Sequence, residues 1–220
     1  MIEFQHVFKS YGRGVNALTD VNFRVAAGEF LFVSGASGAG KSTLLKLIGG
    51  LDTPSRGVVQ VNGQDVGKLP PRARPYLRRA IGVILQDAHL LNDRSAFENV
   101  LLPLIVTGHS PAQASSRARA AIDKVGLSGK ESLRPIALSG GDQQRLAIAR
   151  AIVNRPAILI ADEPTANLDH DSAVRIVEVF RDFNRVGVTT LIATHDQALI
   201  AAYANRVLHV AAGQVTERKP

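Results

Sequence analysis

The sequence predicts an α/β domain whose core alternates strands and helices and is interrupted once by a helical lobe. Apolar runs ending in glycine-rich or acidic segments alternate with helical patterns, and one central stretch is helical throughout. The 220 residues, 45% of them hydrophobic, suit one substantial core. We expect a single domain over 1–220, with 1–86 and 156–220 forming mainly the α/β core and about 87–155 forming the helical subdomain.

The first part of the chain reads as a series of strands and one helix. IEFQHVF alternates, ALTDVNFRV follows, and a turn at Ala27-Gly28 leads to FLFVSG, which is apolar on both faces as in a parallel sheet. This strand runs straight into a glycine-rich loop and the helical pattern KSTLLKLIGG. VVQVNGQDV predicts a hairpin turning at Asn62-Gly63, and IGVILQ predicts a strand ending at Gln86.

The periodicity becomes helical from Ser95 to about Gly126. SAFENVLLPLIV is followed by a second helix that is expected to open at Ser110 as N-cap and Pro111 as first helical residue. After Pro156 the alternation resumes in an order that predicts strands and helices in turn: AILIAD, DSAVRIVEVFRDFNRVG, VTTLIATH, DQALIAAYA and RVLHVAAGQV.

Composition excludes several classes of protein. No run of about 20 apolar residues is present, and Glu3, His6 and Lys9 interrupt any signal-peptide core, so the chain is expected to stay inside the cell. The absence of cysteine excludes disulfides, cysteine-ligated zinc and thiol catalysis. A net charge of +7 is compatible with binding to nucleic acid, to anionic lipid headgroups or to polyphosphate, and does not decide among them. The arginine clusters at 72–79 and 117–119 do not show the repeated aromatic interleaving expected of a single-strand binder.

A phosphate-binding loop is the most specific motif in the chain. GASGAGKS, from Gly35 to Ser42, fits G-x-x-x-x-G-K-[ST] and lies between a predicted strand and a predicted helix. Its glycines let backbone N–H groups approach phosphate, and the helix N-terminus favours negative charge. Lys41 is expected to offset β- and γ-phosphate charge, and the Ser42 hydroxyl to ligate magnesium.

Two carboxylates follow the apolar strand AILIAD, where ligands bind in open α/β sheets. Asp162 and Glu163 are neighbours at a strand end and therefore point different ways, so one can serve magnesium while the other polarises water. An isolated pair would indicate only a solvated strand end. With a phosphate loop in the same chain, the two motifs together predict a P-loop NTPase.

A second candidate anion site lies in LSGGDQQRLAIARAI. Ser139 and two glycines precede a well-patterned helix, whose N-terminus favours negative charge. Taken alone, this segment is more typical of an ordinary glycine-rich helix start.

The motif series as a whole resembles that of ABC ATPase domains, and the resemblance covers essentially the whole chain. It rests on GASGAGKS, Gln86 after IGVIL, LSGGDQQ, ILIADEPTANLD and His195 in LIATHD, in that order. It implies a P-loop core with an inserted helical subdomain and an N-terminal antiparallel β region. It also implies a homodimer in the ATP-bound state, in which the signature of one subunit closes over nucleotide held by the phosphate loop of the other.

The resemblance also implies roles for single residues. Glu163 resembles the general base, His195 the γ-phosphate contact and Lys41 the third catalytic group, while Ser42, Gln86 and Asp162 would hold Mg²⁺. Residues implied in binding ATP are Tyr11 stacking on adenine, the loop Gly35, Ala36, Ser37, Gly38, Ala39, Gly40, Lys41, Ser42 and Thr43, then Gln86, and the signature Ser139, Gly140, Gly141 and Asp142.

The sequence departs from the family pattern in two places. Asp142 stands where the signature usually has Glu, and Ala166 stands where close relatives usually have Gly. An alanine would be strained if that position needs a positive φ. Because Asn167, Leu168 and Asp169 match the loop through which the two sites of the dimer communicate, this communication is expected to be altered.

Within the family, the chain resembles the bacterial cell-division branch most. FEN following LLNDRS, LRRAIGVILQD, IDKVGL, NRPAILIADEPTANLD and FNRVGVTTLIATHD carry this resemblance. It implies a cytoplasmic subunit, peripheral on the inner face of the cell membrane, that couples ATP turnover through an FtsX-like integral membrane partner to cell-wall hydrolase control. The alternative is the ATPase subunit of a lipoprotein-release or macrolide-efflux transporter. A nucleic-acid or translation ATPase is a third class, but no nucleic-acid partner is expected for a single ATPase unit without a heptad run.

Overall fold

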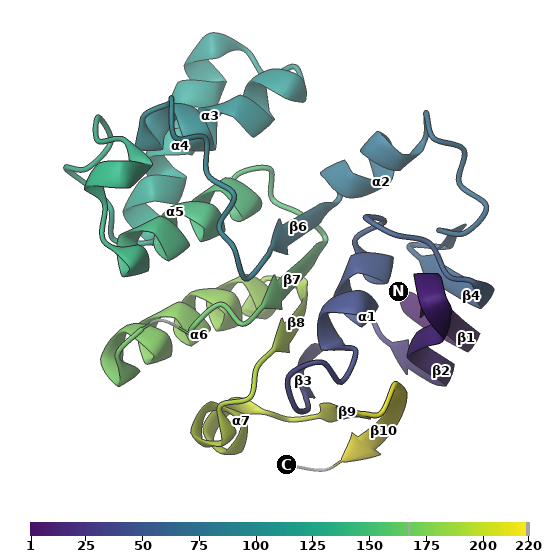
Figure 1. Cartoon of the computed structure of the whole chain (residues 1–220). Helices are drawn as coiled ribbons and strands as arrows, with labels where there is room; N and C mark the ends of the chain where they lie inside the picture. The colour runs from purple at the N-terminus through teal and green to yellow at the C-terminus, as the bar shows by residue number, and fades with distance from the viewer. Residues whose placement is uncertain (167, 219–220) are drawn as a thin grey trace.

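The structure is a computed structural model that describes residues 1–166 and 168–218. In these residues, ten strands form two sheets (Figure 1). The first sheet contains β1 (Ile2–Tyr11), β2 (Val15–Val25), β4 (Arg56–Val61) and β5 (Gln64–Asp65). The second contains β3 (Phe30–Ser34), β6 (Ile81–Ile84), β7 (Ile158–Asp162), β8 (Thr189–Ala193), β9 (Val207–Ala211) and β10 (Gln214–Arg218).

Seven α-helices accompany the sheets in the described part of the chain. They are α1 (Lys41–Ile48), α2 (Arg74–Arg79), α3 (Ala96–Val106), α4 (Pro111–Lys124), α5 (Gly140–Ile152), α6 (His170–Arg185) and α7 (Gln197–Tyr203). Among the residues described, no helix is both long and apolar enough to cross a membrane.

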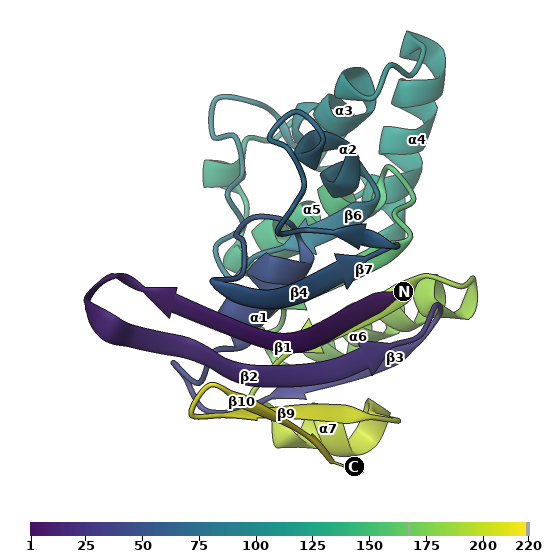
Figure 2. The same cartoon turned by 90° about the vertical axis from the view of Figure 1, so that its right-hand side faces the viewer.

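The larger sheet is parallel except at one edge. Its strand order is β10-β9-β3-β8-β7-β6, with β9 and β10 antiparallel and every other pair parallel. The smaller sheet, in the order β2-β1-β4-β5, is antiparallel throughout and packs in front of α1 (Figure 2). The predicted α/β core and the N-terminal antiparallel region are both confirmed.

Strand alternation divides the core into two layers. Phe30 and Phe32 of β3 face the layer that also contains α3 to α6, whereas Leu31 and Val33 face α1 and the antiparallel sheet. All five residues of β3 are buried. A strand with two buried faces must be apolar throughout, which explains why FLFVS shows no polar alternation.

The chain end and one short helix differ from the sequence prediction. RVLHVAAGQV was expected as one strand, but Ala212, with φ +48°, and Gly213 turn the chain so that β9 and β10 pair as a hairpin. The arginine-rich segment that shows no clear period contains α2, whose Arg78 donates to the Gly50 carbonyl oxygen through Nη2 at 2.8 Å. That bond ties α2 to the end of α1.

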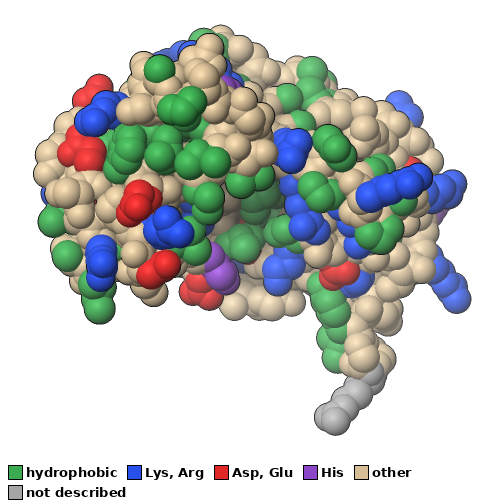
Figure 3. Space-filling model, turned by 90° about the horizontal axis from the view of Figure 1, so that it is seen from above, with side chains coloured by type: hydrophobic (Ala, Val, Ile, Leu, Met, Phe, Trp, Pro, Cys, Tyr) green, Lys and Arg blue, Asp and Glu red, His purple; other side chains and the backbone are tan. Residues whose placement is uncertain are grey.

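The helical lobe is formed by α3, α4 and α5, as predicted. Seen from the top of Figure 1, hydrophobic side chains gather over this lobe on the left, and lysine and arginine side chains gather on the right, where α2 lies (Figure 3). The exposed apolar side chains of α3 are Leu102, Ile105 and Val106. Pro111 opens α4 as expected, although the Ser110 hydroxyl makes no capping bond.

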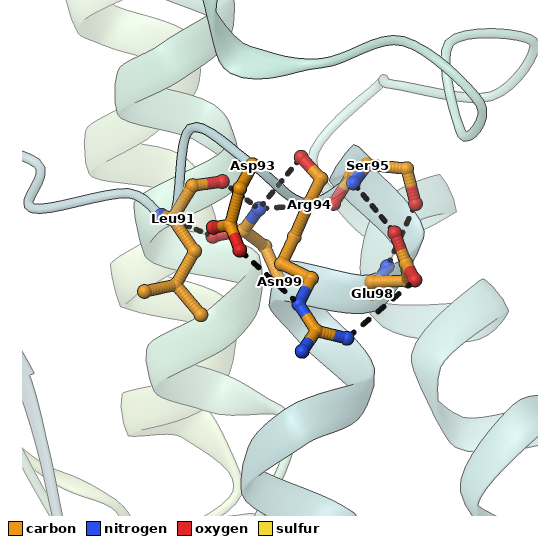
Figure 4. A network of polar contacts seen from close by, with 6 residues as sticks. All are labelled: Leu91, Asp93, Arg94, Ser95, Glu98 and Asn99. Atoms are coloured by element: carbon orange, nitrogen blue, oxygen red, sulfur yellow. Dashed lines mark hydrogen bonds and ion pairs between the residues drawn. The ribbon is translucent and has the colours of Figure 1, made fainter.

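A buried asparagine fixes the segment that leads into the lobe (Figure 4). Asn99 accepts from the Leu91 backbone N–H at 2.8 Å and donates to the carbonyl oxygens of Leu91 at 3.0 Å and Ser95 at 2.9 Å. Ser95 and Glu98 complete a capping box at the start of α3. The polar contacts of Asn99 supplement the backbone hydrogen bonding of this loop, in which the Arg94 N–H donates to the Leu91 carbonyl oxygen at 3.2 Å, so the loop keeps one conformation.

We expect Asn99→Ala to lower the free energy of unfolding by about 3 kcal/mol, because it leaves several buried backbone groups without partners. Urea unfolding followed by circular dichroism measures this change. The exposed neighbour Asn92 supplies the control: Asn92→Ala should shift the stability by less than about 0.5 kcal/mol. Equal effects of the two substitutions would contradict the role given to Asn99.

Candidate functional site

A cleft of 410 Å³ lies at the carboxyl ends of the parallel strands. The phosphate loop, Gln86, the acidic pair and His195 converge on it from four separate segments. Its lining residues are Ala17, Ala36, Ser37, Gly38, Gly40, Lys41, Ser42, Thr43, Gln86, Asp162, Glu163, Ala166 and His195.

The phosphate loop needs glycine where the backbone passes close to neighbouring strands. A Cβ on Gly35, at φ +147°, would lie 2.2 Å from the Val210 carbonyl oxygen of β9. A Cβ on Gly40, at φ +116°, would lie 2.6 Å from the Ala17 carbonyl oxygen. Any side chain at these positions would push the loop away from the sheet edge, so the two glycines set the shape of the cleft.

The Lys41 ammonium is almost completely buried at the floor of the cleft. It donates to the carbonyl oxygens of Gly35 at 2.7 Å and Ala36 at 3.1 Å, and it lies 3.6 Å from Glu163 Oε1. These acceptors compensate the charge, whose burial would otherwise be costly. The ammonium therefore lies where the negative charge of a bound anion would meet it.

Asp162 is a buried carboxyl group at the cleft. Burial raises its pKa, and the neighbouring charge of Glu163 raises it further, while the Ser42 hydroxyl and Lys41 oppose the rise. Its Oδ1 atom is buried and has no hydrogen-bond partner among the described residues. A buried carboxylate oxygen without a partner fits a cation ligand.

Glu163 leaves the strand in a different direction from Asp162. Its φ is +49°, in the left-handed region that non-glycine residues rarely adopt, and its N–H donates to the Ala193 carbonyl oxygen at 2.9 Å. His195 Nδ1 lies 3.0 Å from Glu163 Oε2. The imidazole is otherwise exposed, so it can orient the carboxylate and still reach a ligand.

Tyr11 lies beside the cleft without lining it. Its hydroxyl donates to Asp52 Oδ2 at 3.0 Å and lies 3.5 Å from Thr43 Oγ1. Lys9 holds the other oxygen of Asp52 at 2.6 Å and also lies 4.9 Å from the centre of the Tyr11 ring. The ring is therefore fixed at the edge of the loop, with 41% of the residue exposed.

The signature residues do not line the cleft of their own chain. Ser139 is the N-cap of α5, and its hydroxyl accepts from the Asp142 N–H at 3.2 Å, while Gly140 and Gly141 form the first turn. Burial opposes ionisation of Asp142, but hydrogen bonds from Lys130 and Ser139 hold its pKa below the usual value. Lys130 Nζ lies 2.6 Å from Asp142.

The Ala166 departure causes no backbone strain. Its φ is not positive, and its N–H bonds to the Glu163 carbonyl oxygen at 3.3 Å. The condition under which alanine would be strained is therefore absent. Of the neighbouring loop, Asn167 lies outside the described residues, Leu168 lies against Gly141, and Asp169 caps α6 by accepting from the Ser172 N–H at 2.9 Å.

Sequence reasoning assigned no place in the site to Ala17 or Ala166, although both line the cleft. Ala17 belongs to β2 of the antiparallel sheet and reaches the loop only because that sheet packs on α1. No local sequence signal marks such a position. Gly35 and Ala39 belong to the loop but do not line its cavity, because the loop backbone turns them towards the sheet edge.

Comparisons with known proteins agree with this geometry. The family model described as ABC transporter matches residues 18–166. The cell division ATP-binding protein FtsE of Escherichia coli (strain K12) is 52% identical over 98% of this chain and 97% of its own length. FtsE of Bacillus subtilis is 40% identical over 97% of this chain and 93% of its own. An ATP-binding cassette solved as a post-hydrolysis dimer with ADP and Pi superimposes with a TM-score of 0.94, at 35% identity, over 100% of this chain and 98% of that one.

The chain belongs to the ABC transporter family. Within that family it is an ATP-hydrolysing subunit similar to the FtsE cell division ATP-binding proteins.

We expect Asp162→Asn to make the nucleotide-free protein more stable at pH 7. Because its folded-state pKa is raised, ionised Asp162 costs folding free energy above its ordinary pKa, and the cost disappears as pH falls through the raised value. Thermal melts between pH 7 and pH 4 measure this, with a gain in Tm that shrinks towards acid pH. A lower Tm of the variant at pH 7 would contradict the analysis of the cleft.

Proposed function

We propose that the cleft binds ATP with Mg²⁺ and that Glu163 acts as general base in its hydrolysis. The observation that supports this most is the position of Lys41, which lies between the loop carbonyls and 3.6 Å from Glu163. A γ-phosphate bound at the loop would thus lie close to both the Lys41 ammonium and the Glu163 carboxylate. Phosphoryl transfer depends mainly on such positioning and charge stabilisation.

In the proposed reaction a water molecule attacks the γ-phosphorus and passes its proton to the Glu163 carboxylate. The bond from phosphorus to the β–γ bridging oxygen breaks, and ADP and inorganic phosphate leave. Lys41 and the loop N–H groups stabilise the charge that develops on the phosphate oxygens. His195, 3.0 Å from Glu163, orients the carboxylate and contacts the γ-phosphate.

The residues around Asp162 fit a magnesium ion. The Ser42 hydroxyl, the Gln86 amide and the Asp162 carboxylate are oxygen donors, which Mg²⁺ prefers, and the free Oδ1 of Asp162 is the orphaned acceptor among them. When bound, the ion supplies positive charge to the β- and γ-phosphate oxygens. Gln86 follows β6 at the start of the segment leading to the helical lobe, so it links the cleft to that lobe.

ATP hydrolysis is proposed to proceed in a homodimer. The signature at the start of α5 presents a capped helix N-terminus that does not reach its own cleft, which leaves it available to a nucleotide held by a second copy. Tyr11 would stack on the adenine at the opposite side of the cleft. The dimeric ATP-binding cassettes that the structure resembles support this arrangement.

The cellular role proposed for this dimer is in cell division. It would act on the inner, cytoplasmic face of the cell membrane, docked to an FtsX-like integral membrane partner, and would relay ATP turnover to the control of cell-wall hydrolases. Identity of 40–52% to FtsE over nearly the full chain supports this role. The second candidate is a lipoprotein-release or macrolide-efflux subunit. The macrolide export protein MacB of Sodalis glossinidius is 41% identical over 98% of this chain but only 33% of its own length.

Glu163→Gln should lower kcat for ATP hydrolysis by about 100-fold or more, because the amide cannot accept the proton from water. It should retain ATP binding and accumulate an ATP-dependent dimer in size-exclusion chromatography. Glu178→Gln, at a half-buried position of α6 that does not line the cleft, serves as a charge-matched control with wild-type turnover. Unchanged turnover in Glu163→Gln would refute the assignment of the base.

The same Glu163→Gln variant, trapped with ATP in detergent-solubilised native membranes, should co-purify with its membrane partner, which mass spectrometry identifies. Recovery of a permease-like protein with an FtsX-like extracytoplasmic domain supports the division role. A transporter permease would replace it with the second candidate, and recovery of ribosomes or nucleic acid would exclude both. Lys41→Ala, which should not bind ATP, is the control for ATP dependence.

A further inference from the structure

A second cavity, of 630 Å³, lies in the helical lobe and shares no lining residue with the nucleotide cleft. Its walls come from the end of the α3–α4 connection, from α4, and from the loop between α5 and β7. The lining residues are His109, Ala112, Gln113, Ser116, Arg117 and Arg155. Five of the six are polar or charged, so the cavity suits a polar ligand.

Arg117 is held rigidly in the wall of this cavity. Its Nη2 donates to the Val153 carbonyl oxygen at 3.0 Å, and its Nη1 lies 2.5 Å from His109 Nε2. His109 Nδ1 lies in turn 3.0 Å from Thr107 Oγ1. Because the guanidinium can only donate, Nε2 of His109 is the acceptor in this contact. The guanidinium is thus oriented without being neutralised.

Arg155 brings a second positive charge to the same cavity. Its φ of +53° is left-handed, and its side chain makes no hydrogen bond within residues 1–166 and 168–218. Neither Arg117 nor Arg155 is within 4.0 Å of a carboxylate in the part of the chain that the structure describes. Burial and the nearby Arg155 charge lower the pKa of Arg117.

Cationic side chains near the cavity, in contrast, have an acidic or aromatic partner. Lys124, further along α4, is paired with Asp182 at 2.5 Å, and Arg185 is paired with the same carboxyl group at 2.8 Å. Arg119 stacks over the Phe97 ring at 5.2 Å. Within residues 1–166 and 168–218, these neighbouring cations have an acid or an aromatic ring as partner, whereas the cavity collects two guanidinium groups without an acid.

Exposed apolar side chains lie next to the cavity. Ile105 and Val106 end α3, and Thr107, the following residue, contacts both His109 and Asn154. Asn154 precedes Arg155 in the chain. A cationic cavity beside exposed aliphatic residues is the arrangement that binds the interface of an anionic membrane.

We propose that the cavity lined by Arg117 and Arg155 binds a phosphate group, either in the headgroup of an anionic lipid or in a free phosphate compound. Guanidinium groups match phosphate because they donate paired N–H bonds in one plane. Gln113 and Ser116 line the same space and add further donors. This inference does not depend on ATP hydrolysis in the cleft.

The test measures binding of the full chain to phosphatidylglycerol vesicles and to phosphatidylcholine vesicles by co-sedimentation, with Arg117→Gln, Arg155→Gln and the double variant. Each substitution should weaken binding to the anionic vesicles about fivefold, the usual contribution of one basic residue near such a surface. Arg119→Gln, on the same helix and with the same change of charge, should weaken it less than twofold. Circular dichroism melts establish that the variants remain folded.

A second arm uses pyrophosphate, measured by calorimetry with each arginine substitution placed in the Lys41→Ala variant, whose nucleotide cleft should not bind phosphate. Arginine-dependent binding to anionic vesicles alone assigns the site to a lipid, and arginine-dependent binding of pyrophosphate alone assigns it to a free phosphate compound. If Arg117→Gln and Arg155→Gln match Arg119→Gln in both arms, the proposal is wrong. The ATPase activity of the three variants without lipid should equal that of the wild type.

Discussion

The buried ammonium of Lys41 is the constraint around which the cleft is arranged. A lysine side chain that is 7% exposed needs acceptors, and it finds them in the carbonyl oxygens of its own loop and in Glu163. The loop can curl this tightly only because Gly35 and Gly40 allow close backbone approach to β9 and β2. The loop, the two sheets and Glu163 are thereby fixed relative to the charge of Lys41.

The acidic pair shows how one strand end supplies two kinds of carboxylate. Asp162 stays in the strand and is buried, which raises its pKa and leaves Oδ1 unpaired. Glu163 turns into the left-handed region and meets His195 and Lys41. Backbone strain of this kind persists only where the surroundings enforce it. The two carboxylates that we propose as metal ligand and general base therefore come from adjacent residues without competing for one position.

Much of the fold was predictable because its signals are local. The two-sided apolar strand β3, the helix after the phosphate loop and the opening of α4 at Pro111 all follow from neighbouring residues. The turn between β9 and β10 was missed because Ala212 gives no turn signal. The helix α2 was missed because its six residues, which include three arginines and one tyrosine, show no helical period. Ala17 could not be placed in the site, since packing of the other sheet brings it there.

By itself, the sequence determined which groups are present and in what order: a phosphate loop, an acidic pair at a strand end, a glutamine and a histidine after strands, and a capped helix start. Residue type and short spacing along the chain are enough to specify these motifs. The tertiary structure decided the distances between them, such as 3.0 Å between Glu163 Oε2 and His195 Nδ1. It also decided the burial that raises the pKa of Asp162. It also brought Arg117 and Arg155 into one cavity. Desolvation and contact between distant segments depend on how the elements pack, and no local pattern of residues contains that information.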